Sequence, residues 1–148
     1  MNTRLVKIPT FNEKENIRDI IAHVLGLATL FDVLVVDDGS PDGTGALVKG
    51  MMQEHPDRVH LIERSGKLGL GTAYIKGFKW AIEKKYDYIF EMDADFSHDP
   101  NDLLRLYQAC ADGADMSVGS RYVKGGKVKD WSWDRVMLSV GASMYVRA

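Results

Sequence analysis

Short apolar runs alternate with stretches of helical periodicity along this chain, without internal repeats or a low-complexity linker. Runs rich in β-branched residues predict five short strands, at residues 5–8, 32–36, 58–62, 86–90 and 116–118. Between them, apolar residues recur at the spacing of one helix face, as in Ile17, Ile20, Ile21, Val24 and Leu25. Strands that alternate with helices predict an α/β fold, with a mostly parallel sheet covered by helices.

Three helix starts carry boundary signals. We predict Asn12 as the N-cap of the first helix, with Glu15 completing a capping box. Pro41 stands where the first residue of the second helix is favoured, and Asp99 is expected to cap a later helix that Pro100 opens.

The glycine-rich stretch 66–71 predicts a turn, and the last third of the chain is less regular. Residues 121–133 have no clear period and are expected to form a long loop, followed by a last helix from about residue 134. The helix after the glycine-rich turn carries apolar residues at helical spacing, namely Ala73, Ile75, Phe78, Trp80, Ala81 and Ile82.

The 148 residues are 45% apolar and 27% charged, the composition of an ordinary soluble chain that forms one domain. The net charge of −2 provides no global basic field, so nucleic acid is not expected as a partner. The single Cys110 cannot form an internal disulfide and the four histidines lack zinc spacing, which favours a reducing, cytoplasmic setting. No signal peptide is recognised, and no apolar stretch approaches the roughly 18–20 residues that cross a bilayer.

Two adjacent carboxylates, Asp37 and Asp38, close a strand that is expected to be buried. In open α/β sheets ligands bind beyond the carboxyl ends of the strands. Neighbouring carboxylates there repel one another unless a helix N-terminus, a nucleobase N–H group or a metal-bound diphosphate compensates them. The simpler alternative is that one aspartate caps the following helix.

The same stretch has the glycine spacing of some dinucleotide-binding folds, formed by Gly39, Gly43 and Gly45. A nicotinamide-binding oxidoreductase is therefore a competing interpretation. Asp37, Asp38 and Asp42 argue against it, because they would place negative charge beside a pyrophosphate.

Asp93 and Asp95 follow the fourth predicted strand, with one residue between them. Alternate residues at a strand end point to one side, so both carboxylates can converge on one hard cation and leave positions for phosphate oxygens. This spacing predicts a Mg²⁺ or Mn²⁺ site for a diphosphate. Ser97 and His98 are close enough to add a ligand or a water contact, with ordinary loop positions as the alternative.

Arg121 follows the fifth predicted strand within residues 119–122. A guanidinium beside a divalent cation would complement a diphosphate and the charge that develops on it. A surface ion pair is the alternative.

Five motifs together resemble the polyprenol (dolichol) phosphate mannosyltransferases, which are family-2 glycosyltransferases of GT-A fold. They occur in that family's order and approximate spacing over essentially the whole chain, at residues 9–17, 35–44, 67–74, 92–98 and 119–122. The resemblance implies a GT-A type, Rossmann-like sheet with helices on both faces. It also implies transfer of a hexose, mannose from GDP-mannose, to a polyprenyl or dolichyl monophosphate with inversion at the anomeric carbon. Two alternatives stay open: a UDP-glucose-dependent member with another acceptor, and a catalytically inactive binding module.

The same resemblance implies the site residues. The nucleotide-sugar site would comprise Pro9, Phe11, Glu13, Val36, Asp37, Asp38, Asp93, Ala94, Asp95 and Arg121. Asp93 and Asp95 would hold Mg²⁺ or Mn²⁺ with Ser97 as a third ligand, and Asp95 and Arg121 would be the catalytic residues. Phe11 stands where relatives usually have Tyr, and Ser97 where some carry Gln. An acceptor phosphate is already ionised at neutral pH, so no strong general base is required.

Relatives of this type usually continue for many tens of residues beyond the position of Ala148. We therefore expect a truncated chain with a nucleotide-binding half, an incomplete acceptor half and, as one outcome, no activity. The apolar face of the terminal segment, which carries Arg135 and Arg147, is expected to pack on the sheet. Contact with the cytoplasmic face of a membrane is the alternative.

Overall fold

A computed structural model of the chain describes residues 3–65 and 70–113. The chain divides into two compact units, Met1–Asn101 and Asp102–Ala148. The predicted strand at 116–118, the loop at 121–133 and the last helix lie outside the described residues. Within the described part, no helix is long and apolar enough to cross a membrane.

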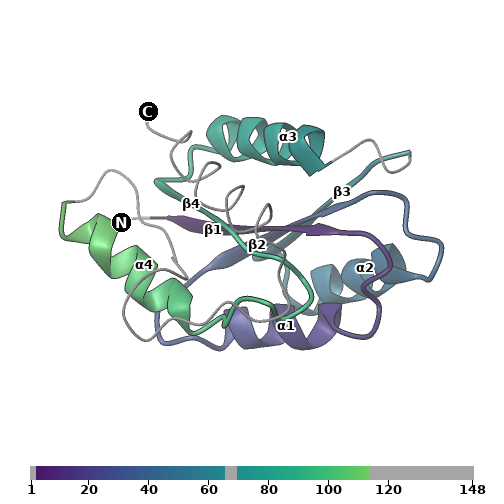
Figure 1. The fold of residues 1–148 in the computed structure, drawn as a ribbon, viewed down its shortest axis with the longest axis horizontal. Coiled ribbons are helices and arrows are strands. Elements are labelled where there is room, and N and C mark those ends of the chain that lie inside the picture. Colours follow the sequence, from purple (N-terminus) through teal and green to yellow (C-terminus); the bar gives the residue numbers. More distant parts are fainter. Residues whose placement is uncertain (1–2, 66–69, 114–148) are drawn as a thin grey trace, which may run out of the picture. The chain divides into compact units, whose positions relative to one another are not determined.

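The first unit is a four-stranded sheet with helices on both faces (Figure 1). Helices α1 and α2 lie on one face and α3 on the other. The second unit contributes α4 (Asp102–Ala111) to the described residues. In chain order the first unit contains β1 (Arg4–Thr10), α1 (Ile17–Leu25), β2 (Asp32–Asp37), α2 (Thr44–Glu54), β3 (Val59–Glu63), α3 (Leu70–Glu83) and β4 (Tyr88–Glu91).

All described strands are parallel, in the order β3-β2-β1-β4. The register places Pro9 beside Val36 and Thr10 beside Asp37. The predicted α/β fold with a mostly parallel sheet and helices on both faces is therefore confirmed. The order also places β1 between β2 and β4, so the loops that follow these three strands emerge side by side.

The core forms where the two central strands are covered on both faces. Residues 33–36 of β2 are fully or almost fully buried, which explains why this strand is a continuous apolar run. Helix α1 buries Ile17, Ile20, Ile21 and Val24, the face that the periodicity predicts. Phe31 and Phe90 add an edge-to-face ring pair with centroids 5.3 Å apart.

The predicted start of the first helix at Asn12 is wrong. Asn12 has a positive φ of 55°, and α1 begins at Ile17 with Asn16 at the N-cap position. The Glu13 carbonyl accepts hydrogen bonds from the N–H groups of Asn16 and Ile17, at 3.1 and 2.9 Å, so a turn precedes the helix.

The predicted helix start at Pro41 is also wrong, because α2 begins at Thr44. Gly43 occupies the N-cap position with φ 97°, a conformation that glycine adopts without strain. Asp42 accepts hydrogen bonds from the Thr44 N–H (3.0 Å) and hydroxyl (2.6 Å), which fixes the first turn. Helix α4 likewise begins two residues after Pro100, since Asp99 accepts a bond from the Asn101 N–H instead.

Candidate functional site

The carboxyl ends of the four strands place the predicted acidic positions at one edge of the sheet. Glu13 lies in the loop after β1, Asp38 directly after β2, and Asp93 and Asp95 in the segment after β4. Ligands of open parallel sheets bind at this edge. The geometry of these loops therefore decides what the site can hold.

The loops after β1 and β2 are joined by side-chain hydrogen bonds to backbone. Ser40, Asp42 and Thr44 each accept a bond from one N–H group of the segment 12–14. The pairs are Asn12 N to Ser40 Oγ (2.9 Å), Glu13 N to Thr44 Oγ1 (3.0 Å) and Lys14 N to Asp42 Oδ2 (3.1 Å). These bonds fix the backbone that carries Phe11 and Glu13 beside the end of β2. Phe11 keeps 37% of its surface exposed.

Asp37 holds the two loops together from within. It is buried and accepts bonds from the hydroxyls of Thr10 (2.7 Å) and Ser40 (2.6 Å), and from the Ser40 N–H (3.0 Å). These donors supply the compensation that adjacent carboxylates require. The alternative that Asp37 or Asp38 caps α2 is wrong, because Gly43 occupies the N-cap position and the Thr44 N–H in the first turn is bound by Asp42.

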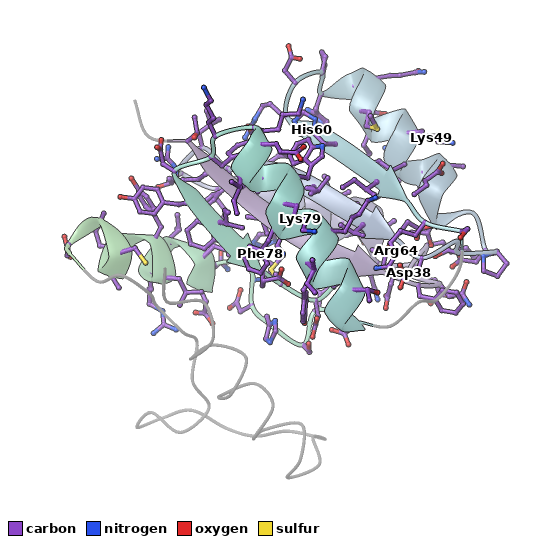
Figure 2. The ribbon with its side chains drawn as sticks, turned by 90° about the horizontal axis from the view of Figure 1, so that it is seen from above. Asp38, Lys49, His60, Arg64, Phe78 and Lys79 are labelled. Carbon is purple, nitrogen blue, oxygen red and sulfur yellow. The ribbon has the colours of Figure 1, made fainter. Side chains whose placement is uncertain are left out.

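Asp38 is paired with a residue that the sequence reasoning missed. Its Oδ1 lies 3.1 Å from Nε of Arg64, and both side chains are buried (Figure 2). Arg64 also donates from Nη2 to the Thr72 hydroxyl (2.6 Å) and from its backbone N–H to the Asp37 carbonyl (2.8 Å). The buried Nη1 of Arg64 has no hydrogen-bond acceptor among the described residues. A basic residue directly after a strand that neighbours an acidic strand end is the signal that could have identified Arg64.

The segment after β4 positions Asp93 and Asp95 differently. Asp93 is half-buried, Asp95 is exposed, and Ala94 between them is buried. Asp95 accepts a bond from the Ser97 N–H at 3.0 Å. Burial acts to raise the pKa of Asp95, but hydrogen bonds from the Ser97 side chain and backbone outweigh it and lower that pKa, which keeps the carboxylate ionised.

Glu13 lies in the electrostatic field of these carboxylates. Burial raises its pKa, a hydrogen bond with Asn16 acts in the opposite direction, and the charges of Asp95, Asp42 and Asp93 raise it further. The loops after β1, β2 and β4 thus share one negative field. Such a field favours a cation.

The carboxylate oxygens of Asp93 and Asp95 suit a hard divalent cation that the protein coordinates only in part. Carboxylate oxygens are the ligands that Mg²⁺ and Mn²⁺ prefer. Within residues 3–65 and 70–113, no group of three or more His, Cys, Asp or Glu is arranged to hold a metal ion by itself. A cation held by Asp93 and Asp95 would therefore take its other ligands from a bound diphosphate and water.

The remaining predicted site residues fall into three sets. Pro9 and Val36 are register partners on adjacent strands just below the two joined loops. Arg121 lies outside the described residues. The Ser97 side chain and the His98 ring lie in the segment that follows Asp95, where His98 Nδ1 accepts a long bond (3.4 Å) from the Asp93 N–H.

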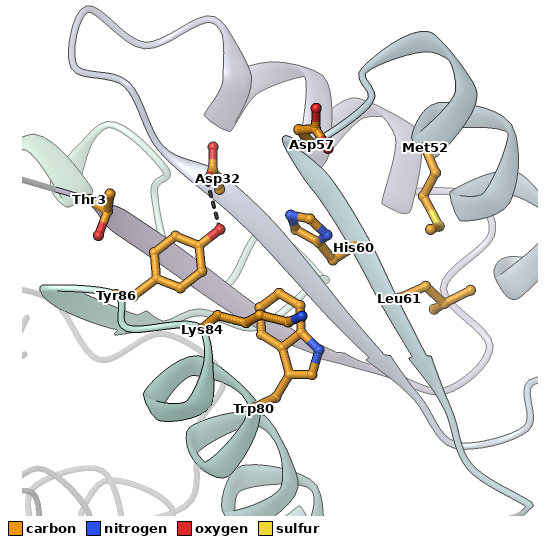
Figure 3. A pocket seen from close by; sticks show the side chains of 9 residues that line it. All are labelled: Thr3, Asp32, Met52, Asp57, His60, Leu61, Trp80, Lys84 and Tyr86. Atoms are coloured by element: carbon orange, nitrogen blue, oxygen red, sulfur yellow. Dashed lines mark hydrogen bonds between the residues drawn. The ribbon is translucent and has the colours of Figure 1, made fainter.

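A cavity of about 430 Å³ lies at the opposite, amino end of the sheet and contains none of the predicted site residues (Figure 3). Its wall includes the Trp80 ring, whose centroid is 5.0 Å from that of His60 and 6.1 Å from that of Tyr86. The Tyr86 hydroxyl donates to Asp32 at 2.7 Å. The lining residues are Thr3, Asp32, Met52, Asp57, His60, Leu61, Trp80, Lys84 and Tyr86.

Three relatives align with nearly all of this chain. A polyprenol monophosphomannose synthase of Mycolicibacterium smegmatis is 50% identical, over 97% of this chain and 54% of the relative. An undecaprenyl-phosphate mannosyltransferase of Micrococcus luteus is 46% identical, over 97% of this chain and 58% of the relative. A dolichol-phosphate mannosyltransferase of Pyrococcus furiosus is 40% identical, over 96% of this chain and 40% of the relative. The chain thus spans about half the length of these relatives.

Two solved structures share the fold. The mannosyltransferase PcManGT from Pyrobaculum calidifontis, in complex with GDP-Man and Mn²⁺, has a TM-score of 0.69 at 25% identity over 81% of this chain and 36% of that one. TarS of S. aureus has a TM-score of 0.61 at 21% identity over 86% and 38%, which supports the fold alone. The sequence profile of glycosyl transferase family 2 matches residues 6–146. Because that match spans nearly the whole chain and agrees with the parallel sheet and its acidic carboxyl edge, the chain belongs to glycosyl transferase family 2.

Proposed function

We propose that this chain is the nucleotide-sugar-binding part of a mannosyltransferase that uses GDP-mannose and a polyprenyl phosphate acceptor. The observation that carries the proposal is the acidic carboxyl edge, where the loops after β1, β2 and β4 share one field around Glu13. Relatives named for polyprenol and dolichol phosphate, at 40 to 50% identity, support the acceptor class. Family membership argues against the oxidoreductase alternative.

The nucleoside end of the donor is assigned to the two joined loops. Phe11 offers an exposed ring for stacking, and Glu13 and Asp38 offer carboxylates that can accept from base or ribose donors. Pro9 and Val36, which pair on adjacent strands just before these loops, are assigned to the same site. Asp37 accepts hydrogen bonds from Thr10 and Ser40, and its role is to hold the two loops in place.

Asp93 and Asp95 are assigned to a divalent cation on the diphosphate, with Ser97 beside them and the Ala94 backbone lining the same pocket. The PcManGT complex contains Mn²⁺ with GDP-Man, which supports a divalent metal of this kind. When bound, the metal would neutralise charge on the leaving diphosphate. Arg121 is assigned to the same diphosphate or to the acceptor phosphate.

The proposed reaction is an inverting substitution at the anomeric carbon. An oxygen of the acceptor phosphate forms the new bond while the bond to the GDP oxygen breaks, and both electrons of that bond leave with GDP. The acceptor phosphate is ionised at neutral pH, so the chain need not provide a strong base. A lipid acceptor implies that the reaction takes place at a membrane surface, for which we propose the cytoplasmic side.

A transfer assay tests the proposal. The chain is incubated with labelled GDP-mannose, Mn²⁺ and a short polyprenyl phosphate, and label is measured in the organic phase; UDP-glucose replaces the donor in a parallel arm. We expect mannose transfer that a chelator abolishes, and none from UDP-glucose. Binding of GDP-mannose without transfer would limit this chain to donor binding, and equal use of both donors would contradict the assignment.

A further inference from the structure

The outward side of α3 carries the two most exposed large apolar residues of the described chain. Ile75 is 57% exposed and Ile82 is 67% exposed. They are seven residues apart, which places them on one side of a helix. The opposite side of α3 packs on the sheet through buried Gly77 and Ala81.

Lysines surround these isoleucines. Lys76 and Lys79 are exposed on the same helix, and Lys84 and Lys85 follow directly after its end. Figure 2 looks onto α3 as it crosses the sheet, with Lys79 labelled along it. Residues 76–85 carry four lysines against one glutamate, in a chain whose net charge is −2. We call Ile75, Lys76, Lys79 and Ile82 the outer face of α3.

This combination fits a lipid surface better than a protein partner. Protein interfaces are depleted in lysine, whereas interfacial helices place apolar side chains into the bilayer and keep lysines at the headgroups. Lysine stems also pack along apolar surface while their ammonium groups reach outward. No helix of the described residues can span a bilayer, so contact with lipid through this part of the chain would be peripheral.

We propose that the outer face of α3 docks on an anionic lipid bilayer. The inference rests on the proposed function, because a polyprenyl phosphate acceptor is held in such a bilayer. The face lies on the helix that begins beside the carboxyl edge, where Thr72 accepts from Arg64. Docking through α3 would therefore bring the proposed GDP-mannose site close to the membrane surface.

Cosedimentation with vesicles of phosphatidylcholine, with and without phosphatidylglycerol, tests the docking face. One lysine near an anionic surface contributes about fivefold to binding. Lys79→Gln is therefore expected to weaken binding about fivefold, while Lys49→Gln, which removes the same charge from α2 on the other face, leaves it unchanged. Ile75→Ser/Ile82→Ser is expected to weaken binding about a hundredfold through lost apolar burial. Leu30→Ser, at 56% exposed outside α3, is the matched apolar control without effect.

Three results would overturn the docking face. These are no vesicle binding by the unmodified chain, equal losses in Lys79→Gln and Lys49→Gln, or conversion of a dimer to a monomer by Ile75→Ser/Ile82→Ser in light scattering. Calorimetry with GDP-mannose and Mn²⁺ separates this inference from the proposed function. All four variants are expected to bind GDP-mannose as the unmodified chain does. Absence of GDP-mannose binding together with α3-dependent vesicle binding would refute the function and leave the docking face.

Discussion

Lys7 offers the sharpest test of how the sheet holds its buried charge. It lies in the middle of β1 with 1% of its surface exposed. Its Nζ pairs with the Glu91 carboxylate, donates to the Tyr74 carbonyl (3.0 Å) and lies 3.3 Å from the centroid of the Phe78 ring. Replacing Lys7 with Met removes the cation and leaves the Glu91 carboxylate without its charged partner.

The expected loss follows from the burial of the remaining carboxylate. Breaking a buried ion pair by removing one partner destabilises a protein by about 3–5 kcal/mol. Glu91 keeps 29% of its side chain exposed, so we expect about 3 kcal/mol at pH 8, at the lower end of that range.

The loss should depend on pH. Burial raises the pKa of Glu91 to about 7, while the charge and hydrogen bond of Lys7 act to lower it. Without Lys7 that pKa rises further, so the folded variant holds a proton that the unfolded chain releases above about pH 4.5. The unmodified chain also holds this proton up to about pH 7, so the two chains differ in their pH dependence only above that pH, where the loss grows by about 1.4 kcal/mol per pH unit. The loss at pH 5 is therefore expected to be about 1 kcal/mol smaller than the loss at pH 8.

Urea unfolding followed by circular dichroism at pH 5 and pH 8 measures both quantities. Lys7→Met/Glu91→Gln, which removes both charges, is the matched control and should recover to within about 1–2 kcal/mol of the unmodified chain at pH 8. A loss for Lys7→Met that is equal at both pH values, or a double variant as unstable as the single one, would refute the reasoning.

Three further variants test other contacts. Gly77→Ala should destabilise the chain by about 1–3 kcal/mol in thermal unfolding, because its Cβ would lie 2.7 Å from Cδ of the enclosed Lys7; no change would show that α3 can move away from β1. Ser40→Ala removes a donor to Asp37 and an acceptor for the Asn12 N–H, so we expect a loss of about 1–3 kcal/mol and weaker GDP-mannose binding in calorimetry; unaltered binding would separate these loops from the donor site. Arg64→Met leaves Asp38 buried without its cation and should destabilise the chain by about 3 kcal/mol in urea; a near-neutral effect would show that the pair contributes nothing net.

Local patterns in the sequence predicted the elements of the fold well. Strand β2 and the buried face of α1 follow from apolar runs and helical spacing, which depend only on neighbours along the chain. The start of α1 did not follow from them. Asn12 and Asn16 are both acceptable caps by type, and the choice depends on Ser40 and Thr44, which bind the 12–14 backbone from a loop about 30 residues later.

The other features that the sequence did not predict depend on contacts between segments far apart in the chain. The compensation of Asp37 by Thr10 requires the pairing of β1 with β2, and the pairing of Asp38 with Arg64 requires that β3 lie beside β2. A lysine within the buried strand β1 has no local explanation, since its partner Glu91 comes from β4. The acidic strand ends could be placed at one edge of the sheet because the carboxyl ends of parallel strands always lie there. The residues that bind these carboxylates come from other segments and depend on tertiary packing, which the sequence does not show.

The central claim is that the acidic carboxyl edge binds a metal-bridged nucleoside diphosphate sugar. Calorimetric titration of GDP-mannose into the chain, with Mn²⁺ and with a chelator, tests it most directly when repeated on Asp95→Ala. Binding that requires Mn²⁺ and disappears in Asp95→Ala is the predicted result. Equal affinity with and without the metal, or undiminished binding by Asp95→Ala, would contradict the account.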